Sequence, residues 1–224
     1  MVRTYDKLLF MNEDTKLFIE ELKVRPDVLG VIMFGSWARG NNRQDSDVDL
    51  IVILTEGYRR TVEYKNNQAF EIIYTTTKSA LEFWQSKKDD CFGLWSVAKV
   101  IYDKDGTIEE LRQKAKDILK EGKKPIDEYQ KGQYKFSAED EIRAVEKMVD
   151  TDEATANLVL TYTVQNLTVL FFDLRQMWTP APKQRLSKIA EVDPNIGALF
   201  SRFYKSNLLN EKTELAKGIL AGLF

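Results

Sequence analysis

Two aspartates separated by one residue open an apolar segment of the chain. Asp47 and Asp49 flank Val48 at the start of the run Val48–Leu54. Because side chains alternate between the faces of a β-strand, both carboxylates are expected on the same face. Ionised carboxylates that lie side by side repel each other, and a hard divalent cation such as Mg²⁺ suits such oxygen ligands. An isolated Asp-x-Asp pair is more often a solvated strand end than a metal site.

A third acid lies inside the next apolar run. Glu71 falls within Ala69–Thr75, where a charge is costly unless it is paired or bound to a metal. A strand here, beside the strand of Asp47 and Asp49, would bring three carboxylates together. That layout suits metal-dependent phosphoryl or nucleotidyl transfer. Glu71 would then be a metal ligand, a general base for the attacking hydroxyl, or both. Taken alone, it is also compatible with an outward-pointing residue of an edge strand.

A glycine–serine pair precedes the acids. Gly35 ends the apolar run Val28–Phe34, where the backbone must turn tightly or admit a ligand closely. Ser36 offers a hydroxyl and a backbone N–H near an expected helix start, a place suited to phosphate oxygens. Arg39 has the reach to contact a phosphate or to hold the loop through a carboxylate. A Gly-Ser pair alone is an ordinary turn, but all these features in this order are far more specific.

The amino-acid composition excludes several catalytic mechanisms and several classes of protein. The 224 residues include no histidine, which excludes Ser-His-Asp and Cys-His mechanisms and histidine zinc sites. With 33 basic and 35 acidic residues, the net charge of −2 argues against a protein that wraps nucleic acid electrostatically. The single cysteine, Cys91, cannot form an intrachain disulfide, which fits the reducing cytoplasm. No segment reaches the ~18 apolar residues of a membrane helix, and Met1–Phe10 lacks the pattern of a secretory signal.

The elements that position these residues change in character along the chain. Short apolar runs predict strands at Val28–Phe34, Val48–Leu54, Ala69–Thr75 and Lys99–Tyr102. In the same half, helices are expected at Glu13–Lys23 and Ile108–Glu121. Beyond the boundary candidate Gly122–Pro125, helices are expected at Ala138–Val149, Glu153–Met177 and Lys183–Glu191, and over Asn195–Phe224 in one or two pieces. The sequence therefore predicts a mixed α/β domain over residues 1–122 and an all-α helical bundle over residues 123–224.

The segments Gly35-Ser36, Arg39-Gly40 and Ser46-Asp47-Val48-Asp49-Leu50 together resemble the signature of the nucleotidyltransferase superfamily that includes DNA polymerase beta. Among its members the chain looks most like the small bacterial antibiotic nucleotidyltransferases of the kanamycin and lincosamide type. The signature covers residues 35–50, and the resemblance extends more loosely over residues 13–122. It implies a small mixed α/β sheet with helices on one side, and a C-terminal helical domain that closes over the acceptor.

The resemblance also implies a reaction. A hydroxyl-bearing small molecule would receive a nucleoside monophosphate from a nucleoside triphosphate, with ATP as the expected donor and one or two Mg²⁺ ions. Asp47 and Asp49 match the family's metal ligands, and Glu71 is the best match for a third. Gly35 and Ser36 match the family's phosphate-binding turn. The full candidate nucleotide-binding set is Gly35, Ser36, Arg39, Ser46 and Lys183.

The helical half offers weaker signals. The run Phe171–Lys183 resembles an aromatic–Trp–Pro–Pro–Lys helix end of some relatives, which makes Lys183 a candidate phosphate contact. Trp178 or Tyr162 could stack on a base or an acceptor ring, although the helical spacing of Phe171, Leu174 and Trp178 favours a core role. The acidic run Glu139–Glu153 would attract a cationic acceptor such as an aminoglycoside, or form a solvated helix face. Aromatic helix faces here are also compatible with a homodimer interface.

Other functions stay open on the sequence alone. A non-catalytic nucleotide-sensing or partner-binding protein would keep the same motif without turnover. An antitoxin-type protein adenylyltransferase would use a protein hydroxyl as its acceptor, although such relatives usually lack a helical tail of about 100 residues. A nucleic-acid acceptor is disfavoured by the low net charge, despite a modest basic stretch. That stretch consists of Lys120, Lys123, Lys124, Lys131 and Lys135.

Overall fold

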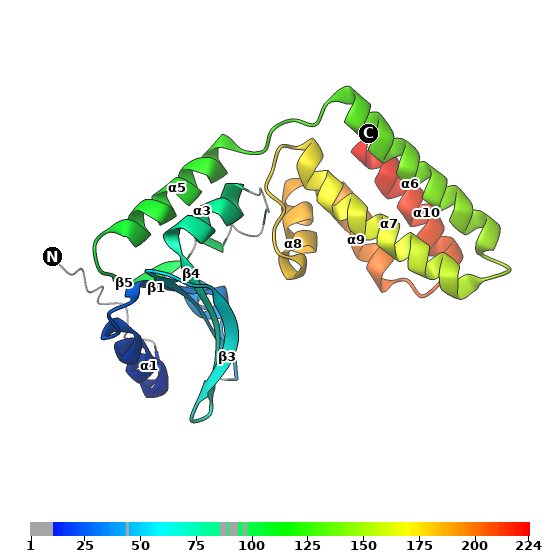
Figure 1. The fold of residues 1–224 in the computed structure, drawn as a ribbon. Coiled ribbons are helices and arrows are strands. Elements are labelled where there is room, and N and C mark those ends of the chain that lie inside the picture. The colour runs from blue at the N-terminus through cyan, green and yellow to red at the C-terminus, as the bar shows by residue number, and fades with distance from the viewer. Residues whose placement is uncertain (1–10, 44, 86–88, 90–93, 96–97) are drawn as a thin grey trace. The chain divides into compact units, whose positions relative to one another are not determined.

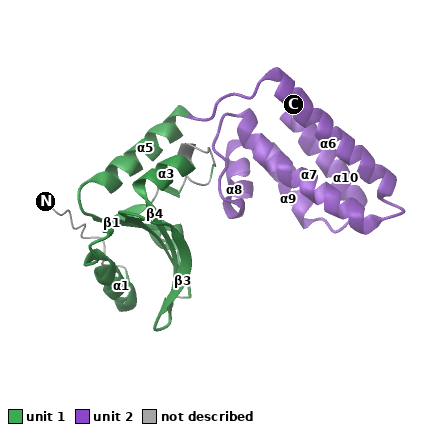
Figure 2. Cartoon of the chain, in the orientation of Figure 1, with its two compact units in different colours: residues 1–121 green, residues 122–224 purple. Residues whose placement is uncertain are grey.

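The computed structural model describes residues 11–43, 45–85, 89, 94–95 and 98–224. Residues 1–10 and Cys91, which carry the predictions on a leader peptide and on the redox environment, lie outside the described residues. The chain divides into two compact units, Met1–Glu121 and Gly122–Phe224 (Figure 2).

The first unit is a mixed sheet with helices on both faces. Its elements are α1 (Glu13–Lys23), β1 (Val28–Phe34), α2 (Gly35–Arg39), β2 (Val48–Leu54), β3 (Arg59–Lys65), β4 (Gln68–Thr76), α3 (Thr77–Gln85), β5 (Lys99–Asp103) and α5 (Thr107–Glu121) (Figure 1). Among the described residues, five strands form one sheet in the order β3-β4-β2-β1-β5. Strands β2 and β4 run parallel, and the other neighbours are antiparallel.

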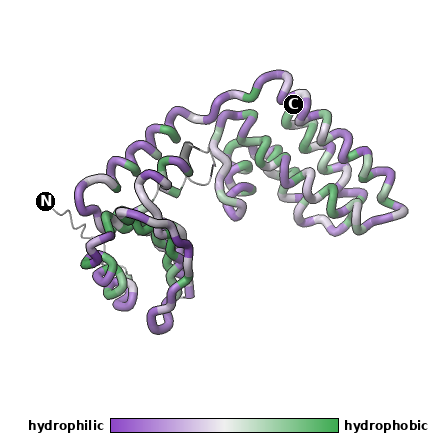
Figure 3. The backbone as a smooth tube through the Cα atoms, in the orientation of Figure 1, coloured by the Kyte–Doolittle hydropathy of each residue, from purple (hydrophilic) through white to green (hydrophobic). Residues whose placement is uncertain are grey.

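A different helix packs on each face of the sheet. On one face, Phe18 of α1 packs on Phe70 of β4, with ring centroids 4.6 Å apart. On the other, Ile108 of α5 lies against Gly30 of β1, where an added Cβ would be 2.2 Å from Ile108 Cγ1. Helices therefore cover both faces, not one as the resemblance implied. Apolar residues are concentrated in the central strands of the sheet, while α5 is mainly hydrophilic (Figure 3).

Strand β3 was not predicted from the sequence. Its side chains are exposed or half-buried along its whole length, so no apolar run marks it. The strand forms a hairpin with β4, in which Lys65 pairs with Gln68 across the two residues Asn66 and Asn67. Asn66 has φ 52°, the left-handed conformation that tight hairpin turns favour. An Asn-Asn pair between two extended segments was therefore the available signal.

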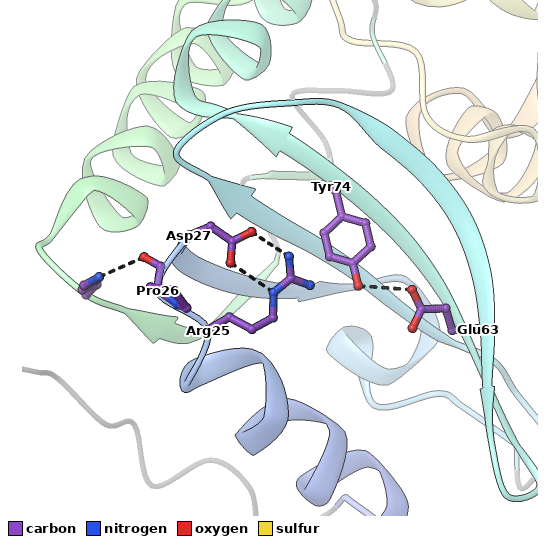
Figure 4. A network of polar contacts seen from close by, with 6 residues as sticks. Arg25, Pro26, Asp27, Glu63 and Tyr74 are labelled. Atoms are coloured by element: carbon purple, nitrogen blue, oxygen red, sulfur yellow. Dashed lines mark hydrogen bonds and ion pairs between the residues drawn. The ribbon is translucent and has the colours of Figure 1, made fainter.

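An ion pair fixes the entry into β1. The Arg25 guanidinium donates hydrogen bonds of 3.1 and 2.7 Å to the two carboxylate oxygens of Asp27 (Figure 4). These bonds hold the pKa of Asp27 below its usual value. The guanidinium also lies 5.5 Å from the ring centroid of Tyr74, whose hydroxyl donates to Glu63. Burial raises the pKa of the Tyr74 phenol. The end of α1, β1 and the β3–β4 hairpin are thus tied together on this face.

The second unit is helical. Its elements are α6 (Glu128–Met148), α7 (Glu153–Leu174), α8 (Pro182–Val192), α9 (Pro194–Lys205) and α10 (Leu209–Leu223). The helix α6 begins ten residues before its predicted start at Ala138. A capping box causes this, because Asp127 and Gln130 each accept a hydrogen bond from the backbone N–H of the other. Residues 128–137 are mostly exposed, so no apolar periodicity indicates this part of the helix.

Apolar side chains from all five of these helices form the core of the second unit. Phe171 and Phe172 of α7 and Phe200 and Phe203 of α9 are fully buried. The core role expected for Phe171 is therefore correct. Helices α8 and α9 approach each other closely at Gly197, where an added Cβ would lie 2.5 Å from Cα of Ala190. None of the described helices combines the length and apolar character needed to cross a bilayer.

Candidate active site

Sheet pairing places the acidic residues of different strands next to each other. In the parallel pair of β2 and β4, Asp49 lies opposite Glu71. In the antiparallel pair of β1 and β2, Asp49 lies opposite Phe34, the last residue of β1. Asp49 thus occupies a central strand, with Glu71 on one side and the Gly35 turn on the other.

Three carboxylates converge at this point. Asp47, Asp49 and Glu71 each offer one carboxylate oxygen, and these oxygens all lie within 4.8 Å of one another. Asp47 is exposed, and the other two residues are half-buried. Like charges this close destabilise one another unless a cation lies among them. Because all the donors are carboxylate oxygens, the set fits a hard divalent cation such as Mg²⁺.

The glycine–serine turn belongs to the same site. Gly35 has φ +67°, and a Cβ added there would lie 1.7 Å from Oδ2 of Asp49. Any side chain at residue 35 would therefore displace the carboxylate. Ser36 follows as the second residue of α2 and is half-buried. The short helix ends at Gly40, whose φ is +74°.

The loop before Asp47 is anchored through one carbonyl. The backbone oxygen of Ser46 accepts hydrogen bonds from Nε1 of Trp37 at 3.4 Å and from Nε2 of Gln68 at 3.0 Å. Gln68 in turn accepts a bond of 2.9 Å from the side chain of Asn12. Trp37 and Gln68 are both buried, so this arrangement fixes the backbone directly before the first aspartate. The sequence analysis did not single out either residue.

The other predicted nucleotide-binding residues, Ser46, Arg39 and Lys183, differ in their hydrogen bonds and their exposure to solvent. The hydroxyl of Ser46 accepts a bond of 2.9 Å from the backbone N–H of Arg43, which closes the loop. Arg39 is exposed and forms no ion pair within the described part of the chain. The ion pair of the loop joins Arg43 to Asp45 and lowers the pKa of Asp45. Lys183 belongs to the second unit, where it is exposed near the start of α8.

A basic residue that was not predicted from the sequence contacts Glu71. Arg60 on β3 donates from Nε to Oε1 of Glu71 at 2.9 Å, and its Nη2 bonds the same oxygen more closely. The hydrogen bond with Glu71 raises the pKa of Arg60. In the hairpin register Val62 lies opposite Glu71, so Arg60 is the diagonal neighbour on the same face. Finding β3 from its Asn66–Asn67 turn would have placed Arg60 there.

Comparisons with known proteins bear on this site. A family model described as "Nucleotidyltransferase domain" matches residues 15–145. Among solved structures, a nucleotidyltransferase-like protein from Exiguobacterium sibiricum 255-15 is similar over 94% of this chain and 73% of that one, with a TM-score of 0.52 and 13% identity. At that identity the likeness concerns the fold alone. No sequence among the curated proteins matches this chain. Because the family match spans more than half of the 224 residues and includes all three carboxylates, the chain belongs to the nucleotidyltransferase domain family and is a nucleotidyltransferase.

Proposed function

We propose that the first unit transfers a nucleoside monophosphate from a nucleoside triphosphate to a hydroxyl of a small molecule, with ATP as the expected donor and Mg²⁺ as the metal. The observation that carries this proposal is the convergence of three carboxylate oxygens within 4.8 Å of one another, beside a glycine turn that leaves no room for a side chain. The family relationship indicates the class of reaction, and the three carboxylates are the proposed site of that reaction.

Asp47, Asp49 and Glu71 would hold the metal. When bound, a divalent ion would offset the negative charge of the triphosphate and polarise its α-phosphate. The backbone N–H groups of the Gly35–Ser36 turn would contact phosphate oxygens. Glu71 would accept the proton of the acceptor hydroxyl. The hydroxyl oxygen would then form a bond to the α-phosphorus, and the bond to the pyrophosphate oxygen would break.

The second unit is proposed to serve the acceptor and the donor phosphates. Acidic residues line α6, and Tyr162 on α7 exposes 59% of its surface, which would suit a cationic acceptor with a ring. An aminoglycoside-like antibiotic has this chemistry, and a lincosamide-like acceptor is a further candidate. Lys183 is the proposed phosphate contact from this unit. The exposed aromatic residues would also suit a homodimer interface.

A transfer assay tests this function. The protein is incubated with Mg²⁺, α-labelled triphosphates and a panel of aminoglycosides and lincosamides, and both labelled product and pyrophosphate are measured. We expect labelled acceptor with the wild type and a loss of at least a thousandfold for Asp47→Asn and Asp49→Asn, an effect typical of removing a metal ligand. Asp45→Asn is the matched control, because Asp45 is exposed in the same loop and pairs with Arg43.

The outcomes separate the alternatives. Full activity in either ligand variant would refute the assigned site. Label on protein instead of the small molecules would show a protein adenylyltransferase. Nucleotide binding without pyrophosphate release for any acceptor would indicate a nucleotide-sensing protein.

A further inference from the structure

We propose that Arg60 is the built-in counter-cation of the acidic site, and that it competes with the divalent metal for Glu71. This inference rests on the proposed function, since it takes the three carboxylates to be the metal site. Arg60 comes from the edge strand β3, outside the signature of residues 35–50. It would lower the affinity for free metal and hold Glu71 in place until metal binds.

The contact geometry supports a direct role. Two guanidinium nitrogens of Arg60 bond the same oxygen, Oε1 of Glu71, and within the described residues no donor bonds its Oε2. While Arg60 holds Oε1, Glu71 still offers a carboxylate oxygen within 4.8 Å of oxygens of Asp47 and Asp49. An arginine contact on one side of a carboxylate also limits the side-chain motion that charge repulsion from Asp49 would otherwise cause.

The charge balance indicates competition. Three carboxylates carry three negative charges when ionised, and Arg60 offsets one of them before any metal binds. A divalent ion that approaches Glu71 meets the positive guanidinium at short range, which disfavours its binding. The Arg60 side chain is 65% exposed and that of Glu71 is 27% exposed, so solvent weakens this repulsion without removing it. We expect an effect of about three- to tenfold on metal affinity in such a site.

Arg59 provides a matched control. It precedes Arg60 on the same strand, carries the same charge and is exposed. It lies opposite Tyr74, on the other face of the sheet, and bonds Thr61. Replacing either arginine by glutamine changes the net charge of the protein equally, but only Arg60→Gln removes the contact with Glu71.

The experiment measures binding of Mn²⁺ alone by electron paramagnetic resonance, without nucleotide or acceptor. We expect Arg60→Gln to bind Mn²⁺ about three- to tenfold more tightly than the wild type. Arg59→Gln should stay within about twofold of the wild type, since screening by salt weakens more distant charges. In a Glu71→Gln background, the gain from Arg60→Gln should disappear. Arg60→Lys, which keeps the charge, should stay near wild-type affinity. Arg60→Ala, which removes both the charge and the contact with Glu71, should bind more tightly and serves if Arg60→Gln folds poorly.

The results distinguish two failures. Equal changes for Arg60→Gln and Arg59→Gln, or weaker binding by Arg60→Gln, would overturn the role of Arg60 and leave the metal site intact. Absence of Mn²⁺ binding by the wild type, or binding that Asp49→Asn leaves unchanged, would overturn the metal site itself and with it the proposed function.

Discussion

At the scale of single residues, the site depends on the absence of a side chain at Gly35. The carboxylate of Asp49 occupies the space where a Cβ would be, at 1.7 Å from Oδ2. The same residue needs a positive φ, which L-residues adopt only at a cost. Gly35 therefore serves both the backbone turn and the placement of Asp49, the proposed metal ligand.

Gly35→Ala separates these two requirements when it is compared with Gly40→Ala. Both glycines have positive φ, but nothing lies within 4 Å of a Cβ added at Gly40. Each variant should lower the free energy of unfolding by about 1–2 kcal/mol through the backbone alone. Only Gly35→Ala should also weaken Mn²⁺ binding by at least tenfold, because it displaces Asp49. Denaturant unfolding and metal titration measure the two effects, and equal metal affinity in both variants would contradict this explanation.

At the scale of elements, the parallel pairing of β2 and β4 is what brings the acids together. It places Asp49 opposite Glu71. Strands that are buried on both faces are recognisable in sequence as apolar runs. Strands β1 and β2 are of this kind, and they begin and end where the apolar runs do. A charge inside such a run, as at Glu71, is conspicuous for the same reason.

Exposed elements were harder to predict. Strand β3 lies at the edge of the sheet, where solvated side chains remove the apolar pattern, and Arg60 was missed along with it. The first half of α6 depends on the cap formed by Asp127 and Gln130 and not on packing. The hydrogen bond from Gln68 to the Ser46 carbonyl joins residues far apart in sequence, so only the folded sheet reveals it. Local patterns thus indicate buried elements, whereas edge positions need the tertiary arrangement.

The contact of α5 with the sheet gives a prediction at this scale. Gly30→Ala would place a Cβ 2.2 Å from Cγ1 of Ile108 and 2.9 Å from the backbone oxygen of Tyr102. Overpacking of this kind should lower the free energy of unfolding by about 1–3 kcal/mol. Ile108→Ala creates space at the same position, so the double variant should be more stable than the sum of the single effects predicts. Urea unfolding measures all three variants, and strict additivity would show that α5 does not pack on β1 through this pair.

At the scale of the whole molecule, the chemistry and the proposed acceptor functions belong to different units. The three carboxylates and Arg60 lie in residues 1–121, whereas Tyr162 and Lys183 lie in residues 122–224. The family match ends at residue 145, within α6, so most of the helical unit lies beyond it. Substrate preference is therefore expected to depend on residues outside the matched segment, and metal binding is expected to depend on residues within it.

We propose that these carboxylates bind the metal of a nucleoside triphosphate complex. The most direct test of this claim is the thermal unfolding midpoint of the full chain with each of four nucleoside triphosphates, with and without Mg²⁺. We expect a Mg²⁺-dependent rise of several degrees with the preferred triphosphate, since a ligand at about a hundred times its Kd stabilises the folded state by about 2.7 kcal/mol. Asp45→Asn should keep this rise, and Asp49→Asn, which preserves the side-chain shape beside Gly35, should lose it. An equal rise in Asp49→Asn, or no rise with any triphosphate, would contradict the claim.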